Sequence, residues 1–483
     1  MGRGAGKGGD AQHWLDKQQA RVTTRVLDVK DVGAPVTFSM EEVRKHRTPG
    51  DAWMVYKNKV YDVSGWYEHP GGNVIFTHAG DDFTDIFAAF HPPSAYGTME
   101  AFYIGDLDHS SRVAKPPAQL KFEKGYRELR SKLITMGMFN ADLWYYARLC
   151  IQLAAIWGAS VACVLCSERW DVNMFGALLL ATFWQQSGWL SHDFLHHQVF
   201  KTRAYGDLAG VFWGNLGQGF SVGWWKNKHN THHAVPNLHA SSTEAHDGDP
   251  DIDTMPLLAW SLKMAQAASL DAQGRFMIAH QAVLYFPILL AARVSWVIQS
   301  YMFVFDCLPR AGVWSTHMAE TARLRNSSLA SKLEMPALVG YLGWVMYLWA
   351  HLGFWRGLVF FSVAQMGGGL FLALVFGLGH NGMATYDADD RPDFWKLQVT
   401  TTRNVTSTPF VDWFCGGLQY QVDHHLFPQL PRHNFKKVHD LVSSFCQEHG
   451  VGYHEATFVE GTKEVLRHLD KVAMEFITEF PAM

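Results

Sequence analysis

Histidines gather in three short clusters that could bind metal ions. The clusters read HDFLHH from His192, HNTHH from His229 and QVDHH from Gln421. Because side chains three and four positions apart share one face of a helix, three sets can each face one point: His192 with His196; His229 with His232 and His233; and Gln421 with His424 and His425. His197 falls off the face of its cluster. Imidazole suits iron, copper and zinc, so the clusters predict one shared metal site.

His380 is a further candidate for this site. It follows the apolar stretch 354–378, and an ionisable side chain at such a place is a functional candidate by default. A second polar segment, DGDPDID at 247–253, resembles a calcium loop but lacks glycine at the sixth position and glutamate at the twelfth. We interpret it as a turn-rich loop without an assigned role.

A different pair of histidines could bind a heme group. His69 opens the sequence HPGG, and His91 follows 22 residues later, after the apolar segment FAAF. Two axial imidazoles leave no open position for oxygen, which suits electron transfer. Gly71 and Gly72 would let the backbone approach the ring closely. These features predict a small electron-transfer domain around His69 and His91.

The composition limits the kind of protein that can carry these sites. Charged residues make up 18% of the 483 residues, against roughly 25% in an average soluble domain, and the formal charge is -4. This balance argues against nucleic acid binding through bulk charge, and six scattered cysteines do not form a disulfide framework. The mean hydropathy of -0.07 excludes a chain embedded in a membrane throughout. We therefore expect membrane spans together with water-exposed parts.

Composition also divides the chain into segments. We expect a mobile N-terminal tail over 1–35, a compact domain over 36–110, a linker with a pre-membrane helix over 111–142, a membrane domain over 143–460 and a C-terminal tail over 461–483. Residues 60–111 contain eight acidic side chains and no lysine or arginine. Such a surface is either simply solvated or able to steer a basic partner.

Five apolar stretches approach the length of about 20 residues that crosses a bilayer: 143–166, 172–190, 282–304, 336–350 and 354–378. If the three clusters meet, an even number of crossings separates the second from the third. The stretch 282–304 carries Arg293 at its centre, which costs at least about 2.5–3.5 kcal/mol in a spanning helix, so we expect it not to cross. Four spans with both chain ends in the cytoplasm result. Basic residues before the last two spans agree with this orientation: Arg310, Arg323, Arg325 and Lys332.

Taken together, the motifs resemble a known family. His69 and His91 in their setting look like a cytochrome b5-type domain, and the three clusters in their order resemble the front-end fatty acid desaturases. Gln421 stands where most membrane desaturases have histidine, which is typical of this subgroup. The segments 184–200, 226–239, 379–386 and 410–434 are similar to the delta-6 desaturases of diatoms and related microalgae. The resemblance extends over residues 36–460.

The resemblance implies a fold and a set of cofactors. The fold would be an α+β cytochrome b5-like heme domain fused to an all-α integral membrane desaturase domain with about four transmembrane helices and a cytoplasmic histidine-rich cap. Heme b would be bound by His69 and His91. Two non-heme iron ions would be bound by His192, His196, His197, His229, His232, His233, His380, Gln421, His424 and His425. Related enzymes differ in whether the fourth or the fifth residue after the first histidine binds, so both His196 and His197 belong to this set.

The resemblance also implies a reaction. The family inserts a cis double bond between an existing double bond and the carboxyl end of an acyl chain, using O2 and two electrons from cytochrome b5. Delta-6 desaturation of 18-carbon chains would convert linoleoyl to gamma-linolenoyl and alpha-linolenoyl to stearidonoyl groups, on phospholipid or CoA, in polyunsaturated fatty acid biosynthesis. The expected partners are NADH-cytochrome b5 reductase and membrane lipid, without nucleic acid, and the expected location is the endoplasmic reticulum membrane.

Several alternatives share parts of this pattern. Front-end desaturases of other positions, delta-5, delta-8 or sphingolipid delta-8, differ in substrate rather than in motif. A fatty acyl hydroxylase uses the same oxygen chemistry but would carry additional histidine motifs and no glutamine in the third cluster. A membrane hemoprotein without enzymatic activity would leave the clustered histidines unexplained. Trp189, Gln185 and Gln186, close to the first cluster, are candidates to line an acyl tunnel.

Overall fold

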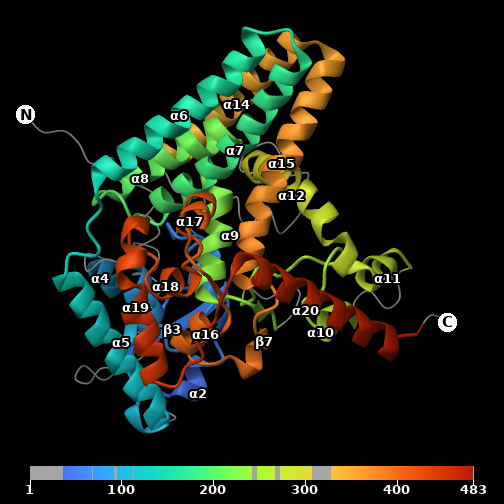
Figure 1. Ribbon diagram of the computed structural model, residues 1–483. Coiled ribbons are helices and arrows are strands. Elements are labelled where there is room, and N and C mark those ends of the chain that lie inside the picture. Colours follow the sequence, from blue (N-terminus) through green and yellow to red (C-terminus); the bar gives the residue numbers. More distant parts are fainter. Residues whose placement is uncertain are drawn as a thin grey trace, which may run out of the picture.

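The computed structural model of the chain describes residues 36–67, 69–91, 95–112, 114–241, 247–266, 272–306 and 328–481. The expected tail over 1–35 and the basic residues Arg310, Arg323 and Arg325 lie outside these ranges. The structure has a small mixed domain at the start, a helical bundle at one end and a set of short helices between them (Figure 1).

The first domain is built on a five-stranded sheet. Its strands are β1 (Thr37–Phe38), β2 (Arg47–Thr48), β3 (Asp51–Tyr56), β4 (Lys59–Asp62) and β5 (Tyr103–Leu107), in the spatial order β1-β5-β4-β3-β2. β3 and β4 form a hairpin whose two turn residues, Lys57 and Asn58, have φ angles of 47° and 68°. Such paired positive angles match the right-handed twist of the strands.

Short helices cover both faces of this sheet. α2 (Met40–Val43) packs on one face, with Trp53 and Val55. The 3₁₀ turn η1 (Asn73–Phe76), α3 (Thr84–Phe90) and α4 (Tyr96–Met99) cover the other face. Met54 and Tyr61 of the sheet pack with Phe76 and Phe87 in one apolar core. His69 lies just before η1 and His91 just after α3, so this core positions both.

A linker helix attaches this domain to the rest of the chain. α5 (Pro117–Thr135) begins with proline at its first turn, where the missing N–H costs nothing. Phe122, Tyr126, Leu129 and Leu133 lie on one helical face and pack against α19 (Arg432–Glu448). The linker is therefore held against the C-terminal part of the chain.

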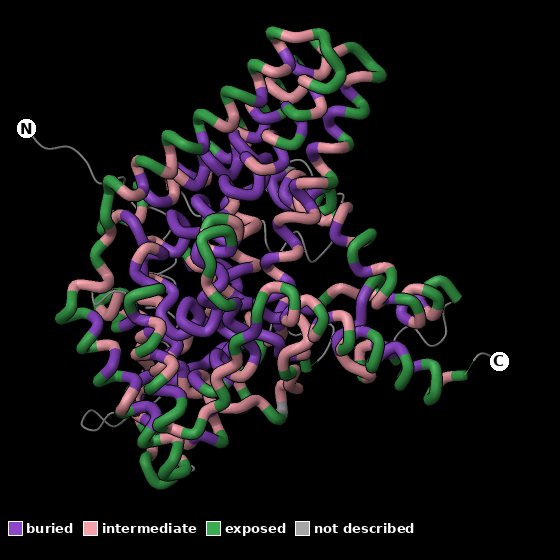
Figure 2. Tube along the Cα trace, in the orientation of Figure 1, coloured by how far each residue is buried: buried purple, intermediate pink, exposed green. Residues whose placement is uncertain are grey.

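Four long helices run side by side into one end of the molecule (Figure 1). They are α6 (Leu143–Leu165), α7 (Trp170–Leu195), α14 (Leu329–Leu352) and α15 (Phe354–His380). Their inner faces are buried and their outer faces are exposed (Figure 2). The exposed faces carry large apolar side chains such as Trp144, Ile151, Val339 and Trp355. An extended exposed apolar surface of this kind favours contact with lipid.

A fifth long helix, α12 (Gln281–Asp306), crosses the base of this bundle obliquely and packs along α15 (Figure 1). Arg293 at its centre is fully buried. Its guanidinium donates to the carbonyl of Gln218 and to the Tyr341 hydroxyl, and it stacks over the Trp184 ring at 3.7 Å. Because Arg293 faces protein rather than lipid, it does not by itself keep this stretch out of the membrane, contrary to the expectation from the sequence.

By length and composition, three helices among the described residues can cross a membrane: α6, the α12 segment Gln281–Val304, and α15. α7 and α14 lie beside them in the bundle but are not among these three. The count of four spans thus stays a prediction.

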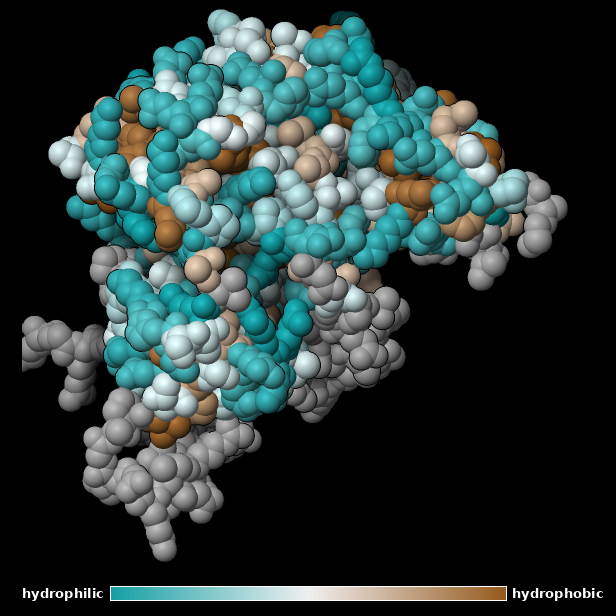
Figure 3. All heavy atoms as spheres, turned by 90° about the horizontal axis from the view of Figure 1, so that it is seen from below, coloured by the Kyte–Doolittle hydropathy of each residue, from teal (hydrophilic) through white to brown (hydrophobic). Residues whose placement is uncertain are grey.

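The space between the bundle and the first domain is filled by short elements, which we call the cap. They are α8 (Arg203–Gly210), the π-helix η5 (Val211–Leu216), α9 (Val222–Ala234), α16 (Phe394–Thr400), α17 (Pro409–Cys415), α18 (Gln421–Leu426) and α19. Two short parallel pairs tie the loops together: β6 (Leu238–His239) with β7 (Tyr386–Asp387), and β8 (Asn404–Val405) with β9 (Glu455–Ala456). The face at the end opposite the bundle is mainly hydrophilic (Figure 3).

The C-terminal residues are helical rather than a tail. We expected a tail over 461–483 from the sequence, but α20 (Phe458–Glu479) continues through most of this segment. Val465, Leu469, Val472 and Phe476 lie on one face of it and are buried. They pack against α12 and against α10 (Leu262–Gln266) and α11 (Ala272–Ala279). The amphipathic repeat explains why this segment folds onto the rest.

Candidate functional site

Five histidines from the three clusters converge beneath the bundle. They are His192, His196, His229, His233 and His424, and one ring nitrogen of each lies within 4.8 Å of the others. The Nε2 atom of His229 lies 3.0 Å from that of His196 and 3.1 Å from that of His233. The Nε2 atom of His424 lies 3.1 Å from that of His233. Nitrogens that converge in this way are arranged as the ligands of one ion would be.

A second group adjoins the first. His232, His380 and His425 place ring nitrogens within 4.8 Å of one another, and the Nε2 atoms of His232 and His380 are 3.2 Å apart. The ring of His425 stacks on that of His233 in the first group, with centroids 4.1 Å apart. The structure therefore holds two neighbouring groups of histidines.

This division corrects the expectation that each cluster faces a single point. On α9, His229 and His233 turn to the first group and His232 turns to the second. On α18, His424 and His425 likewise separate. Adjacent helical residues point about 100° apart, so a pair of consecutive histidines can serve two neighbouring ions.

Further polar residues orient these imidazoles. His232 Nδ1 lies 2.9 Å from Asp249 Oδ2, and that carboxylate also accepts from the backbone N–H groups of Asn237 and Asp251. His425 Nδ1 lies 2.8 Å from the side-chain oxygen of Gln398. Such partners fix the tautomer of a metal-binding histidine and leave its other nitrogen free. Asp249 comes from the segment 247–253, to which the sequence analysis gave no role.

The protonation of the histidines suits metal binding. Burial, reinforced by neighbouring imidazoles, holds the pKa of four of them well below the ordinary value: His229, His233, His424 and His425. Neutral imidazole is the form that binds metal. His192 Nε2 and His425 Nε2 are buried without a hydrogen-bond partner among the described residues. Buried polar atoms are rarely left unpaired, so the donor set fits bound cations.

Gln421 and His197 differ in their placement. Gln421 is buried, and its side-chain nitrogen lies 2.7 Å from His380 Nε2, so its amide borders the second group. His197 belongs to neither group. Its backbone has a φ of 57° directly after the end of α7, and its side chain turns toward the first domain. Of the two candidates from the first cluster, the structure brings His196 to the metal-type site and not His197.

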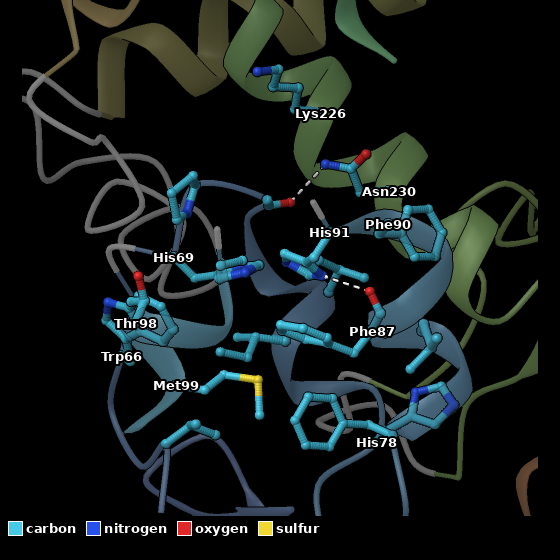
Figure 4. Close-up of a pocket in the computed structure, with 18 of the residues that line it drawn as sticks. Trp66, His69, His78, Phe87, Phe90, His91, Thr98, Met99, Lys226 and Asn230 are labelled. Carbon is cyan, nitrogen blue, oxygen red and sulfur yellow. Dashed lines mark hydrogen bonds between the residues drawn. The ribbon is translucent and has the colours of Figure 1, made fainter. Parts of the chain in front are cut away.

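A second site lies in the first domain. His69 and His91 border a cavity of about 460 Å³ whose walls include Trp66, Phe87 and Met99 (Figure 4). Their ring centroids are 5.9 Å apart. Two imidazoles bound to opposite sides of one ion at about 2 Å would show a similar spacing. A side chain at Gly71 would meet the ring of His69 at 2.7 Å, which explains the glycine.

Hydrogen bonds orient both rings. His69 Nδ1 lies 3.2 Å from the carbonyl of Gly72, and His91 Nδ1 lies 3.3 Å from that of Phe87. These contacts leave both Nε2 atoms available to an iron ion. Burial lowers the pKa of His69 to about 4, and burial together with the charges of His69 and Arg203 lowers that of His91 to about 3. The arrangement fits a heme with two neutral axial imidazoles.

The cap closes this cavity, so the two sites share a wall. On α9, Asn227 accepts from the backbone N–H of Asn73. Asn230 on the same helix donates to the carbonyl of Gly71 (Figure 4). The helix that carries the HNTHH cluster therefore touches the HPGG loop directly. His196 lines the heme-type cavity and also belongs to the first histidine group. The imidazole of His196 thus borders both sites.

Ion pairs hold the first domain in this position. Asp81 pairs with Arg391 at 2.6 Å, Asp82 with Arg112, and Asp85 with Arg127 at 3.2 Å. Part of the acidic surface is therefore engaged within the chain.

A third feature is an apolar cavity of about 400 Å³ on the other side of the histidine groups. His229, His232, His380 and Gln421 border it, and from there it extends between α12 and α15 past Ile288, Leu289, Trp296, Leu372 and Phe376. Trp189, Gln185 and Gln186 do not line it, because they hydrogen-bond to the backbone of α17 instead. The cavity could hold an apolar chain with one end against the histidines.

Comparisons with known proteins agree with this arrangement. The family model "Fatty acid desaturase" matches residues 170–457, and the model "Cytochrome b5-like Heme/Steroid binding domain" matches residues 39–108. The chain is 38% identical to an acyl-lipid (9-3)-desaturase of Physcomitrium patens, covering 90% of this chain and 78% of that protein. It is 33% identical to a delta(6)-fatty-acid desaturase of Caenorhabditis elegans, covering 84% and 92%. It is also 33% identical to a delta(8)-fatty-acid desaturase of Euglena gracilis, covering 85% and 93%.

Proposed function

Since the chain belongs to the fatty acid desaturase family, as a front-end desaturase with an N-terminal cytochrome b5 domain, we propose that it forms the delta-6 double bond of 18-carbon polyunsaturated acyl chains. Linoleoyl and alpha-linolenoyl groups are the proposed substrates. The observation that carries the proposal is the apolar cavity that ends against His232, His380 and Gln421. The Caenorhabditis elegans relative, which is named for delta(6) desaturation, and the four segments that resemble delta-6 desaturases support the position of the double bond.

We assign two iron ions to the two histidine groups. The ligands of the first would be His192, His196, His229, His233 and His424, and those of the second His232, His380 and His425. Gln421 would bind the second ion through its amide or hold a water beside it. These residues would hold iron for the activation of O2, because side-chain acids and bases cannot break an unactivated C–H bond.

The residues of this chain would perform the remaining tasks. The apolar walls between α12 and α15 bind the acyl chain and exclude water from the reacting carbons. Asp249 and Gln398 hold His232 and His425 in orientation. His69 and His91 would hold the heme, whose chemistry would be electron supply, and His196 borders both the heme cavity and the first group.

The proposed membrane arrangement has four spans, α6, α7, α14 and α15, with α12 across their base. The cap, the cytochrome b5 domain and both chain ends would lie on the cytoplasmic side of the endoplasmic reticulum membrane, within reach of NADH-cytochrome b5 reductase. The hydrophilic face in Figure 3 supports this side as the one in water. A reporter fused after Met483 and one inserted at the turn around Gly353 should map to opposite sides of the membrane.

Delta-8 desaturation is the second candidate. The Euglena gracilis relative and a delta(8)-fatty-acid desaturase of Arabidopsis thaliana, at 28% identity, favour it. The two activities would use the same metal centre and differ in how far the acyl chain enters the cavity.

Expression in a yeast that lacks polyunsaturated fatty acids separates these candidates. Cultures are fed linoleic acid or a 20-carbon diene, and mass spectrometry locates the new double bond. Gamma-linolenic acid from linoleic acid supports the delta-6 proposal. Conversion of only the 20-carbon substrate, at its eighth carbon, would replace it with delta-8.

A further inference from the structure

The heme-type cavity has walls of two characters. The cytochrome b5 domain contributes mainly apolar and aromatic side chains around His69 and His91. Among the described residues that line the cavity, the formally charged ones are Arg203, Asp207 and Lys226, and all three belong to α8 and α9 of the desaturase domain. Among the described lining residues, the cations thus come from outside the domain that supplies the axial histidines.

Arg203 is the cation of this wall whose charge acts on both axial histidines. Its positive charge disfavours protonation of both His69 and His91 and so lowers the pKa of each, after burial. Among the described residues it donates to one acceptor, the carbonyl of Phe90, at 2.9 Å. A guanidinium has five N–H donors in a fixed fork, so most remain for another acceptor. Burial lowers the pKa of Arg203, and Asp207 offsets this only in part.

Lys226 stands beside Arg203 on the same wall. Its ammonium pairs with Asp207 at 2.5 Å, and only 15% of its side chain is exposed. Figure 4 shows Lys226 on α9 above the two axial histidines. Two cations and one carboxylate leave this wall with a net positive charge.

His197 completes the wall. Its ring lies 4.0 Å from Asp207, and its Nδ1 atom is buried without a hydrogen-bond partner among the described residues. A non-glycine residue at a φ of 57° is uncommon, and such a conformation persists where the surroundings require it. Here it turns the ring away from the metal ligands and onto the heme cavity.

We propose that Arg203, Lys226 and His197 of the desaturase domain form the binding site for the carboxylate groups of the heme, so that the two domains share one heme. Heme b is amphiphilic, with an apolar edge and an edge that carries two carboxylates. The apolar edge matches the cytochrome b5 wall and the anionic edge matches the cationic wall. The carboxylate edge then faces His196 and the metal centre. This inference rests on the proposed heme and is independent of the position of the double bond.

The test uses the full-length chain, freed of heme and reconstituted with heme b or with its dimethyl ester, whose carboxylates are neutral. Heme release to excess apomyoglobin and the heme midpoint potential are measured for wild type, Arg203→Gln, Arg203→Lys and Arg391→Gln. Arg391→Gln is the matched control, because Arg391 also joins the two domains, through Asp81, but does not line the cavity.

With heme b, Arg203→Gln should release heme about tenfold faster than wild type, which corresponds to about 1.4 kcal/mol. Its midpoint potential should fall, because a nearby cation favours the reduced, more negative heme. Arg203→Lys should have a heme release rate and a midpoint potential close to those of wild type. Arg391→Gln should match wild type in both. With the dimethyl ester, Arg203→Gln and wild type should release heme equally fast.

Three results would overturn the proposal. Equal release from Arg203→Gln and Arg391→Gln with heme b would show that Arg203 binds no carboxylate. A difference that persists with the dimethyl ester would show that Arg203 acts by holding Phe90 instead. A wild-type chain that binds no heme would refute the heme assignment itself. The delta-6 proposal would still stand if yeast that supplies a separate electron donor made the delta-6 product.

Discussion

The heme cavity and the iron centre place histidines at a common wall but are assembled in different ways. Both axial histidines, His69 and His91, come from one small domain and are separated by 22 residues. The histidines of the iron centre come from α7, α9, α15 and α18, between His192 and His425. A compact domain can thus position a heme pair locally, whereas the iron centre depends on the folding of the whole desaturase domain.

The difference also concerns how each site is supported. The axial rings are oriented by backbone carbonyls of Gly72 and Phe87, close to them in sequence. The iron-centre histidines are oriented by side chains from distant segments, such as Asp249 and Gln398. Substitutions at the iron centre should therefore affect catalysis without affecting the heme, and substitutions at the heme should leave the iron centre intact.

The largest effect is expected at the iron centre. His229→Ala removes a ring that contacts both His196 and His233, so the first group loses a central ligand. Desaturated product should become undetectable and the iron content should fall, while the low-spin heme spectrum stays. The matched control is His351→Ala, an exposed histidine at the end of α14. Normal product from His229→Ala at normal protein level would show that the histidine groups do not form one centre.

The reciprocal change is made at the heme. His91→Ala removes one axial ligand, so the low-spin spectrum should be lost while the non-heme iron content remains. Product should fall strongly, and adding free cytochrome b5 should restore part of it. The heme and iron contents of the purified chain are measured together. Loss of both cofactors would contradict the separate assembly of the two sites.

A smaller effect is expected where a side chain acts through a ligand. Asp249→Asn keeps the shape but removes the charge that faces His232, and changes of this kind lower activity by about 10–100-fold. The matched control is Asp251→Asn, because Asp251 lies farther from His232, at 3.6 Å, and is partly exposed. Product formation and iron affinity are compared for the two variants. Equal activities would remove Asp249 from the support of the centre.

The smallest effect is expected at the boundary between the two sites. Asn227→Ala removes the hydrogen bond to the backbone of Asn73, which contributes about 0.5–1.5 kcal/mol. Heme and iron contents should stay normal, while reoxidation of the heme during turnover should slow several-fold. Asn140→Ala, an exposed asparagine before α6, is the control. Loss of either cofactor in Asn227→Ala would give this residue a structural role instead.

Much of this architecture could be predicted from the sequence because its signals are local. The fusion of a cytochrome b5 domain to a desaturase domain is confirmed by the two family matches. Each of the three histidine clusters is a short sequence motif, and HPGG is followed by the second histidine 22 residues later. The spacing of these residues alone therefore indicated their chemistry. The expectation that the clusters come together also agrees with the structure, for every predicted metal ligand except His197.

What the sequence could not supply depends on tertiary contacts. The histidines of α9 belong to two different groups because of where α15 and α18 lie around that helix, and the sequence does not show where these helices lie. The burial of Arg293 depends on Trp184, Gln218 and Tyr341, which come from other parts of the chain. The role of Asp249 depends on a loop that folds back onto α9. The helix at the C-terminus was the one signal missed, since its apolar residues recur at helical spacing.

The central claim is that electrons pass from the heme to the iron centre within one chain, and rapid mixing tests it most directly. The purified chain, with its heme reduced by one equivalent, is mixed with O2 and acyl substrate, and heme reoxidation is followed at several protein concentrations. We predict a rate that is independent of protein concentration and that is lost when the non-heme iron is removed or in His229→Ala. A rate that rises in proportion to protein concentration, or that is unchanged without the iron, would contradict the account.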